Sequence, residues 1–134
     1  MSEENQALVR QFVQAFNRRD LAAMTRSLDP EVEWTPGGPA AVERAVYQGR
    51  DEVLEGFAST WETWEVFHLE ESEIRGLGDS LLWLGRARFR GGDASHVELD
   101  QEFAVDFLVH GGMIVRFRGF REWQAALEAA GLGK

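Results

Sequence analysis

The stretch VELDQEFAVDFLVHGGMIVRFRGF, residues 97–120, contains two segments of alternating apolar residues separated by two glycines. Alternation with a period of two is typical of β-strands. A Gly-Gly pair between two such segments predicts a tight antiparallel hairpin. We therefore expect strands over Val97–His110 and Met113–Phe120, with His110 opposite Met113.

Two further strands precede this hairpin. Residues 65–76 and 81–90 alternate in the same way, and glycine-containing turns at 76–79 and 91–93 bound them. Consecutive strands joined by short glycine turns form antiparallel neighbours. The sequence from residue 65 onward therefore predicts a meander of four strands.

Helical periodicity surrounds the strands. Apolar residues recur every three to four positions in four segments, which are 3–19, 21–28, 50–64 and 122–130. Residues 31–35 alternate charged and apolar side chains, as a short strand does. This order predicts an α+β fold, a curved antiparallel sheet with helices on one face, in a single domain over residues 1–134.

Composition excludes several kinds of chemistry. The 134 residues include no cysteine, and Lys134 is the only lysine, which excludes disulfides and thiolate nucleophiles and leaves no internal lysine for a Schiff base. The formal net charge is −9, and an acidic protein repels phosphate, so we expect no nucleic-acid partner. The N-terminus has no signal-peptide pattern, and no apolar run is long enough to span a membrane, so we expect a cytoplasmic protein.

Four segments carry a family resemblance: FVQAFNRRDL (12–21), YQGRDEV (47–53), GMIVRFRGF (112–120) and AALEAAGL (125–132). Together they resemble the nuclear transport factor 2-like (NTF2-like) superfamily, and within it the SnoaL-like and ketosteroid-isomerase-like proteins. The resemblance implies a cone in which the bent sheet, three N-terminal helices and a short C-terminal helix enclose one deep apolar pocket. Members include isomerases, polyketide cyclases, dehydratases, epoxide hydrolases and non-enzymatic binding proteins, so the fold alone does not give the activity.

Asp106 is the first candidate catalytic residue. A two-residue turn would place it opposite Phe117, on one sheet face with apolar neighbours such as Leu108 and Val115. A carboxyl group in such surroundings favours its neutral form, which can donate a hydrogen bond to a developing oxyanion. The resemblance implies an oxyanion-hole acid at this place in the last-but-one strand. The alternative is that Asp106 points to solvent or pairs with an arginine.

His68 is the second candidate catalytic residue, because a neutral imidazole on the first long strand can act as a base. The alternative is a structural histidine that bonds to the backbone. We expect His96 and His110 at the surface. No metal-binding spacing and no phosphate or dinucleotide motif is present, so we expect neither a metal nor a cofactor.

Other parts of the ketosteroid isomerase apparatus are missing. The resemblance implies a tyrosine on the first helix and a proton-shuttling aspartate after the first strand, where this sequence has Phe12 and Trp34. Neither side chain can act as a general acid or base. We expect aromatic residues to bind the substrate instead, namely Phe12, Phe16, Trp34, Trp83 and Phe117.

Charges alternate on two consecutive strands, with Arg86, Arg88 and Arg90 beside Glu98, Asp100 and Glu102. In epoxide hydrolases of the superfamily, an arginine between aspartates activates water, and the resemblance implies this as an alternative here. That chemistry needs both charges on one face within hydrogen-bond reach. The other interpretation is a ladder of charge pairs on a solvated or dimer-forming face.

These observations predict a pocket for a small apolar ligand, in an isomerase, cyclase or dehydratase that uses Asp106 as acid or base. The alternatives are a non-catalytic binding protein with the same pocket, and an enzyme resembling the epoxide hydrolases. We also expect a homodimer through the outer sheet face, where Phe103, Val105 and Phe107 would form an apolar strip.

Overall fold

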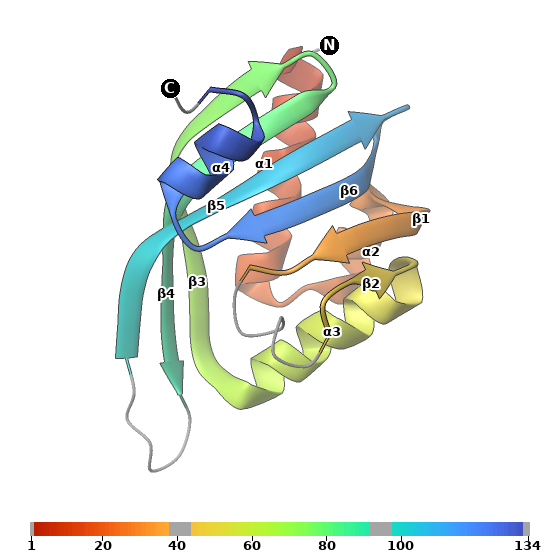
Figure 1. Cartoon of the computed structure of the whole chain (residues 1–134). Helices are drawn as coiled ribbons and strands as arrows, with labels where there is room; N and C mark the ends of the chain where they lie inside the picture. The colour runs from red at the N-terminus through yellow and green to blue at the C-terminus, as the bar shows by residue number, and fades with distance from the viewer. Residues whose placement is uncertain (1, 38–43, 92–97, 133–134) are drawn as a thin grey trace.

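The computed structural model describes residues 2–37, 44–91 and 98–132, and it confirms the predicted α+β class (Figure 1). The helices are α1 (Ser2–Arg18), α2 (Leu21–Ser27), α3 (Arg50–Thr63) and α4 (Trp123–Ala129). The strands are β1 (Leu28–Thr35), β2 (Tyr47–Gln48), β3 (Trp64–Leu77), β4 (Ser80–Gly91), β5 (Glu98–His110) and β6 (Met113–Phe120). Only β2 was not expected. No helix among the described residues has the length and apolar character that crossing a bilayer requires.

The six strands form one sheet in the order β2-β1-β6-β5-β4-β3. Strands β3 to β6 form the predicted antiparallel meander. Strand β1 runs parallel to β6, with Trp34 opposite Phe117, so the expectation of a wholly antiparallel sheet is wrong at this pair. The chain enters β1 from α2 rather than through a hairpin, and only a hairpin forces neighbouring strands to alternate in direction.

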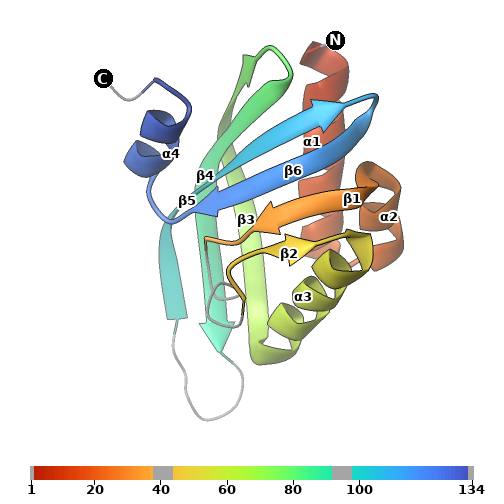
Figure 2. The same ribbon diagram turned by 45° about the vertical axis from the view of Figure 1, so that its right-hand side comes forward.

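The sheet separates two unequal layers of helix. Helices α1, α2 and α3 lie on one side, which we call the inner face, and α4 lies on the opposite side, the outer face (Figures 1 and 2). The expectation that the C-terminal helix helps to enclose the pocket is therefore wrong. Its Ala126 packs with three outer-face residues, Leu82, Leu84 and Ala104, in a small core of their own. The Trp123 indole N–H also donates to the Gly85 carbonyl at 2.9 Å.

Polar side chains fasten the helices to the inner face. The Asn17 amide donates to the Leu69 carbonyl and accepts from the Leu69 N–H, both at 2.9 Å, which ties α1 to β3. Arg19 has a left-handed backbone with φ of 58°. Its guanidinium donates to the Trp61, Trp64 and Glu65 carbonyls, where α3 ends and β3 begins. The bond to Trp61 satisfies a carbonyl group in the last turn of α3, where a helix leaves its carbonyls unpaired.

An irregularity between β5 and β6 decides which side chains face the helices. His110 pairs with Met113 as predicted, and Val109 pairs with Ile114, but the next pair is Leu108 with Arg116. Val115 is therefore an extra residue in β6, a β-bulge. The predicted pairing of Asp106 with Phe117 is wrong, because one extra residue exchanges the faces of everything beyond it.

Candidate functional site

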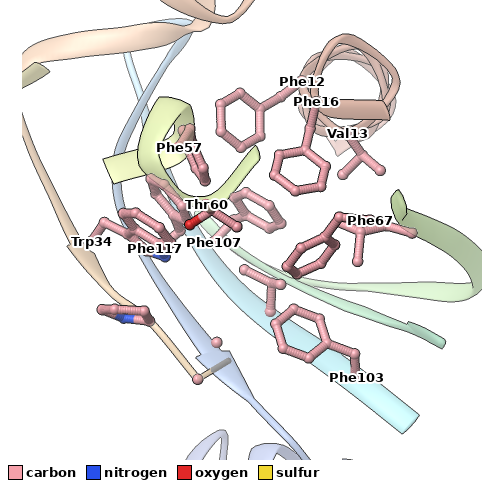
Figure 3. A pocket seen from close by; sticks show the side chains of 15 residues that line it. Phe12, Val13, Phe16, Trp34, Phe57, Thr60, Phe67, Phe103, Phe107 and Phe117 are labelled. Atoms are coloured by element: carbon pink, nitrogen blue, oxygen red, sulfur yellow. The ribbon is translucent and has the colours of Figure 1, made fainter. Parts of the chain in front are cut away.

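An apolar pocket lies between the inner face of the sheet and helices α1 and α3 (Figure 3). The helices contribute Phe12, Val13, Phe16, Phe57 and Thr60. The sheet contributes Trp34, Phe67, Leu69, Phe103, Val105, Phe107, Phe117 and Gly119. Pro36 and Gly37, which follow β1, complete the wall.

The pocket is small and almost without polar groups. Its cavity volume is about 60 Å³. The described lining side chains carry no ionisable group. Their one hydroxyl belongs to Thr60, which donates to the Gly56 carbonyl at 2.9 Å. A molecule in this pocket would meet apolar surface and very few hydrogen-bond partners.

Two glycines form a close backbone contact in the pocket wall. A Cβ atom on Gly37 would lie 2.3 Å from the carbonyl carbon of Gly119, and one on Gly119 would lie 2.8 Å from the amide nitrogen of Gly37. Real side chains do not tolerate such distances, so only glycine lets the segment after β1 close against β6 here. Larger residues at either position would push the wall apart.

The rings of the wall have a regular arrangement. Trp34, Phe57 and Phe107 are nearly parallel to Phe117, with interplanar angles of 14°, 17° and 15° and centroid distances of 5.7, 6.1 and 5.7 Å. Phe12 meets Phe117 edge-on, at 5.4 Å and 71°. Offset-parallel and edge-on contacts are the two arrangements that aromatic quadrupoles favour. The rings therefore hold one another in place and leave a rigid wall.

The structure brings together most of the residues predicted to bind the substrate. Phe12, Phe16, Trp34 and Phe117 line the pocket, and Trp83 does not. Trp83 is fully buried in the core of the inner face, where it pairs across the sheet with Val105. That these aromatic residues bind a substrate stays a prediction.

Asp106 lies on the outer face, away from the pocket. It pairs with Arg118, whose Nη2 atom lies 2.5 Å from the carboxylate oxygen Oδ2. The Asp106 side chain is 14% exposed and the Arg118 side chain 36%. The expected placement among the apolar neighbours of the pocket is wrong, because Asp106 alternates with the inward Val105 and Phe107, and the bulge at Val115 pairs Phe117 with Phe107 instead. The alternative of an arginine partner is what the structure shows.

The two described histidines, His68 and His110, also lie outside the pocket wall. His68 is exposed on β3, opposite the exposed Arg88, and His110 is exposed at the β5–β6 turn. His96 lies outside the described residues. Within the described part of the chain, no group of three or more His, Cys, Asp or Glu side chains could hold a metal ion.

The predicted charge ladder occupies the outer face. Arg86 donates to Asp100 at 2.9 Å, and Arg90 lies 3.6 Å from Glu65, in side chains that are about half exposed. Exposed pairs of this kind contribute little to stability. Arg86 and Asp100 share one face within hydrogen-bond reach, as the epoxide-hydrolase alternative requires, but none of these arginines lines the pocket, and water activation by them stays a prediction.

Shifted pKa values occur at the surface rather than at the pocket. The hydrogen bond to Glu71 raises the pKa of Arg10. The Gln48 N–H donates to Glu52 at 2.9 Å and lowers the pKa of that carboxyl, and the nearby Arg44 adds to the effect. Catalytic groups with tuned pKa values are a common sign of an active site, and these two groups lie away from the lining residues.

The sequence interpretation missed much of the sheet side of the pocket. Phe103, Val105 and Phe107 were expected on the outer face, and they line the pocket with at most 8% exposure. A signal for this existed, since these residues and Val109 form an unbroken apolar set on alternate positions. The register expected of a two-residue turn was given more weight than this apolar alternation. The apolar strip on which the homodimer prediction rests therefore lies on the inner face and not on the outer face.

Solved structures resemble this one over nearly its whole length. An NTF2-like protein of unknown function from Burkholderia pseudomallei has a TM-score of 0.79 at 22% identity, covering 93% of this chain and 95% of that one. An NTF2-like protein from Burkholderia thailandensis has a TM-score of 0.76 at 25% identity, covering 96% and 95%. TerC, co-crystallised with polyporic acid, has a TM-score of 0.77 at 17% identity, covering 93% and 96%.

The sequence agrees with these structural similarities. No protein with a curated description matches the chain. The family model of the SnoaL-like domain matches residues 9–117, a range that runs from α1 to β6 and includes most of the pocket wall. The chain therefore belongs to the SnoaL-like family, whose fold is the NTF2-like cone.

Proposed function

We propose that this protein binds a compact, apolar organic molecule in the inner-face pocket and holds it without converting it. SnoaL-like proteins often are polyketide cyclases or isomerases. One observation favours binding over such catalysis. Among the fifteen lining residues, all of them in the described part of the chain, there is no acid, base or nucleophile other than the Thr60 hydroxyl.

Proton transfer needs a group within hydrogen-bond reach of the reacting atom. The Thr60 hydroxyl is engaged with a helix carbonyl and has no basic partner among the lining residues. Asp106 is held by Arg118 on the far side of the sheet, and His68 is exposed on β3. Neither of the two candidate catalytic residues is placed to reach a ligand that lies against Phe117.

The pocket has the properties of a binding site. Ligand pockets are mostly apolar and largely preformed, and the side chains that line this one carry a single hydroxyl and no charge. A ligand would remove its own apolar surface from water at little cost, because the rings are already ordered by mutual contacts. TerC, a protein of the same fold, has been co-crystallised with an organic molecule, polyporic acid.

Binding and turnover can be tested together. Purified protein would be incubated with styrene oxide and with cyclohex-3-en-1-one, two compact neutral molecules whose hydration or isomerisation is easily followed. We expect shifts in the methyl NMR signals of Val13 and Leu69 on titration, and no product above the buffer rate over several hours. Steady product formation that Asp106→Asn abolishes would overturn the proposal in favour of an enzyme.

A matched pair of variants locates the binding. Val105→Phe places a ring inside the pocket, whereas Val115→Phe makes the same change at the half-buried bulge residue outside the lining set. We expect the first variant to lose the NMR shifts and the second to keep them. Equal loss in both variants, with both folded by circular dichroism, would contradict binding in this pocket.

The homodimer through the outer face is a separate proposal. The observation in its favour is the exposed charge ladder, since a second copy could set the arginines of β4 against the acidic side chains of β5. A dimer mass by light scattering at micromolar concentration that falls at high salt would support it. A monomer mass at low salt would overturn it.

A further inference from the structure

The aromatic rings of the pocket wall have two orientations, one nearly parallel and one edge-on, and together they indicate how the ring of a ligand would lie. Phe107, Phe117 and Trp34 form a nearly parallel set. Phe12 stands edge-on to this set, at 83° to Phe107 and 71° to Phe117, with centroid distances of 6.0 and 5.4 Å. Figure 3 shows these rings converging on one space from α1, β1, β5 and β6.

We infer that the buried part of the ligand is a single uncharged aromatic ring. This inference rests on the proposed binding function and specifies its ligand class. A planar ring that lies parallel to Phe107 and Phe117 would form offset-parallel contacts with them and would stand nearly perpendicular to Phe12. Both geometries place the positive ring edge against a negative face. A saturated ring of similar size has no such quadrupole and gains only from burial.

The lining also argues against a charge on the buried ring. The net charge of −9 draws cations toward the protein as a whole, but no carboxylate stands among the described lining residues to pair with one. Ring faces attract cations, but a cation that gives up its water in this pocket finds no counter-ion among the lining residues. An anion would be less favourable than a cation, because the negative ring faces would repel it.

The size of the space limits the ligand to one ring. The cavity volume is about 60 Å³, and the Gly37–Gly119 contact closes part of the wall. Core rings packed at normal density do not yield a second ring's width without strain. A short substituent can extend toward the open mouth.

The test compares benzyl alcohol with cyclohexylmethanol, which share size and hydroxyl group and differ in the ring. The saturated ring is the more hydrophobic, so burial alone predicts that cyclohexylmethanol binds at least as tightly. We expect benzyl alcohol to bind at least about fivefold more tightly by NMR titration, because two added ring contacts favour it. Benzoate and benzylammonium should each bind at least about tenfold more weakly than benzyl alcohol.

Variants separate the ring effect from the cavity. Phe117→Leu removes a stacking partner while keeping an apolar wall, and we expect it to abolish the preference for benzyl alcohol but to retain cyclohexylmethanol. Phe120→Leu, on the outer face, should leave both affinities unchanged. If Phe117→Leu does not fold, Phe12→Leu tests the edge-on contact in the same way.

The outcomes distinguish the two proposals. Equal or tighter binding of cyclohexylmethanol would overturn the aromatic inference and leave the binding function intact. Tighter binding of benzylammonium would overturn the uncharged class in favour of an organic cation. The binding function itself would be overturned if neither alcohol bound to the folded protein and if Val105→Phe left the NMR shifts with styrene oxide and cyclohex-3-en-1-one unchanged.

Discussion

The two faces of the sheet are made from alternate residues of the same strands, and their side chains differ in polarity. On the inner face, β5 and β6 present Phe103, Val105, Phe107 and Phe117 to a dry pocket. On the outer face, the neighbouring positions carry Glu102, Asp106, Arg116 and Arg118. One face offers aromatic surface for a ligand, and the other offers charges that pair with one another in or near water.

This difference explains why the chemistry expected of the family is absent from the pocket wall described here. A strand can supply an acid to the inner face only at a position in step with the pocket residues. Asp106 is one position out of step. The acidic and basic groups of β4, β5 and β6 therefore lie on the outer face, while the inner face carries the apolar lining of the pocket.

The variant with the largest expected effect on the two faces is one that lacks the bulge. Deleting Val115 shifts residues 116–120 by one position, which would turn Arg116 and Arg118 inward and Phe117 outward. Burying an unpaired guanidinium costs several kcal/mol, comparable with the whole stability of about 5–15 kcal/mol for a small domain. We expect the deletion variant to show no cooperative unfolding transition in urea.

The control for this deletion lengthens the same hairpin without moving the faces. Inserting a glycine between Gly111 and Gly112 changes an exposed turn in which both residues already have positive φ. We expect this variant to unfold cooperatively, within ~1 kcal/mol of the parent. A deletion variant that still folds and binds benzyl alcohol would contradict the role assigned to the bulge.

A second experiment compares one ring on each face. Phe117→Ala empties a position that is 3% exposed and touches rings from α1, α3, β1 and β5, and we expect a loss of about 3–5 kcal/mol in the free energy of unfolding. Phe120→Ala, half-buried under α4, should cost about 1–2 kcal/mol, since less area is lost. Urea unfolding by circular dichroism measures both. Equal losses would mean that the outer core is as important as the inner one.

A third experiment asks what Asp106 does. Asp106→Asn keeps the shape of the side chain and removes the charge that faces Arg118, so we expect about 1–2 kcal/mol of destabilisation. Affinity for benzyl alcohol should stay within twofold, because the pair is on the other face. An affinity change above tenfold at unchanged stability would place Asp106 in contact with the ligand after all.

The smallest effect is expected in the charge ladder. Arg86→Ala removes a half-exposed pair with Asp100, and such pairs contribute about 0–1 kcal/mol. We expect the urea midpoint to move by less than the shift seen for Asp106→Asn, with ligand affinity unchanged. A larger shift would show that the ladder is a cooperative network rather than a set of separate pairs.

The helices and strands were predictable from the sequence, whereas the pairing of the strands was predictable only in part. Periodicity located the helices and the four-stranded meander, because the signals for both are local. The parallel pairing of β1 with β6 had no local signal, since it joins residues 28–35 to residues 114–118. The pocket side of α1 was predictable for the same reason as the helix itself, and Phe12 and Phe16 do line the pocket.

The errors at the site share one physical cause. A turn of two residues was assumed to fix the parity of the whole hairpin, but one unpaired residue in β6 reverses that parity within the strand. Because the faces of Asp106, Phe103, Val105 and Phe107 were inferred from a pairing of Asp106 with Phe117, all four were assigned to the wrong face. Apolar alternation was the better guide at these positions, because it is read along β5 itself and does not depend on the register between β5 and β6.

The sequence by itself determined the composition of both faces, the α+β class and the family, because alternation, helical periodicity and capping residues act between near neighbours. Only the tertiary structure decided which face received the helices α1 and α3 and which received α4. That choice depends on summed burial across strands far apart in the chain, and a single bulge at Val115 transmits it to every later residue of β6. The pocket is the result of that choice, and so is the removal of Asp106 from it.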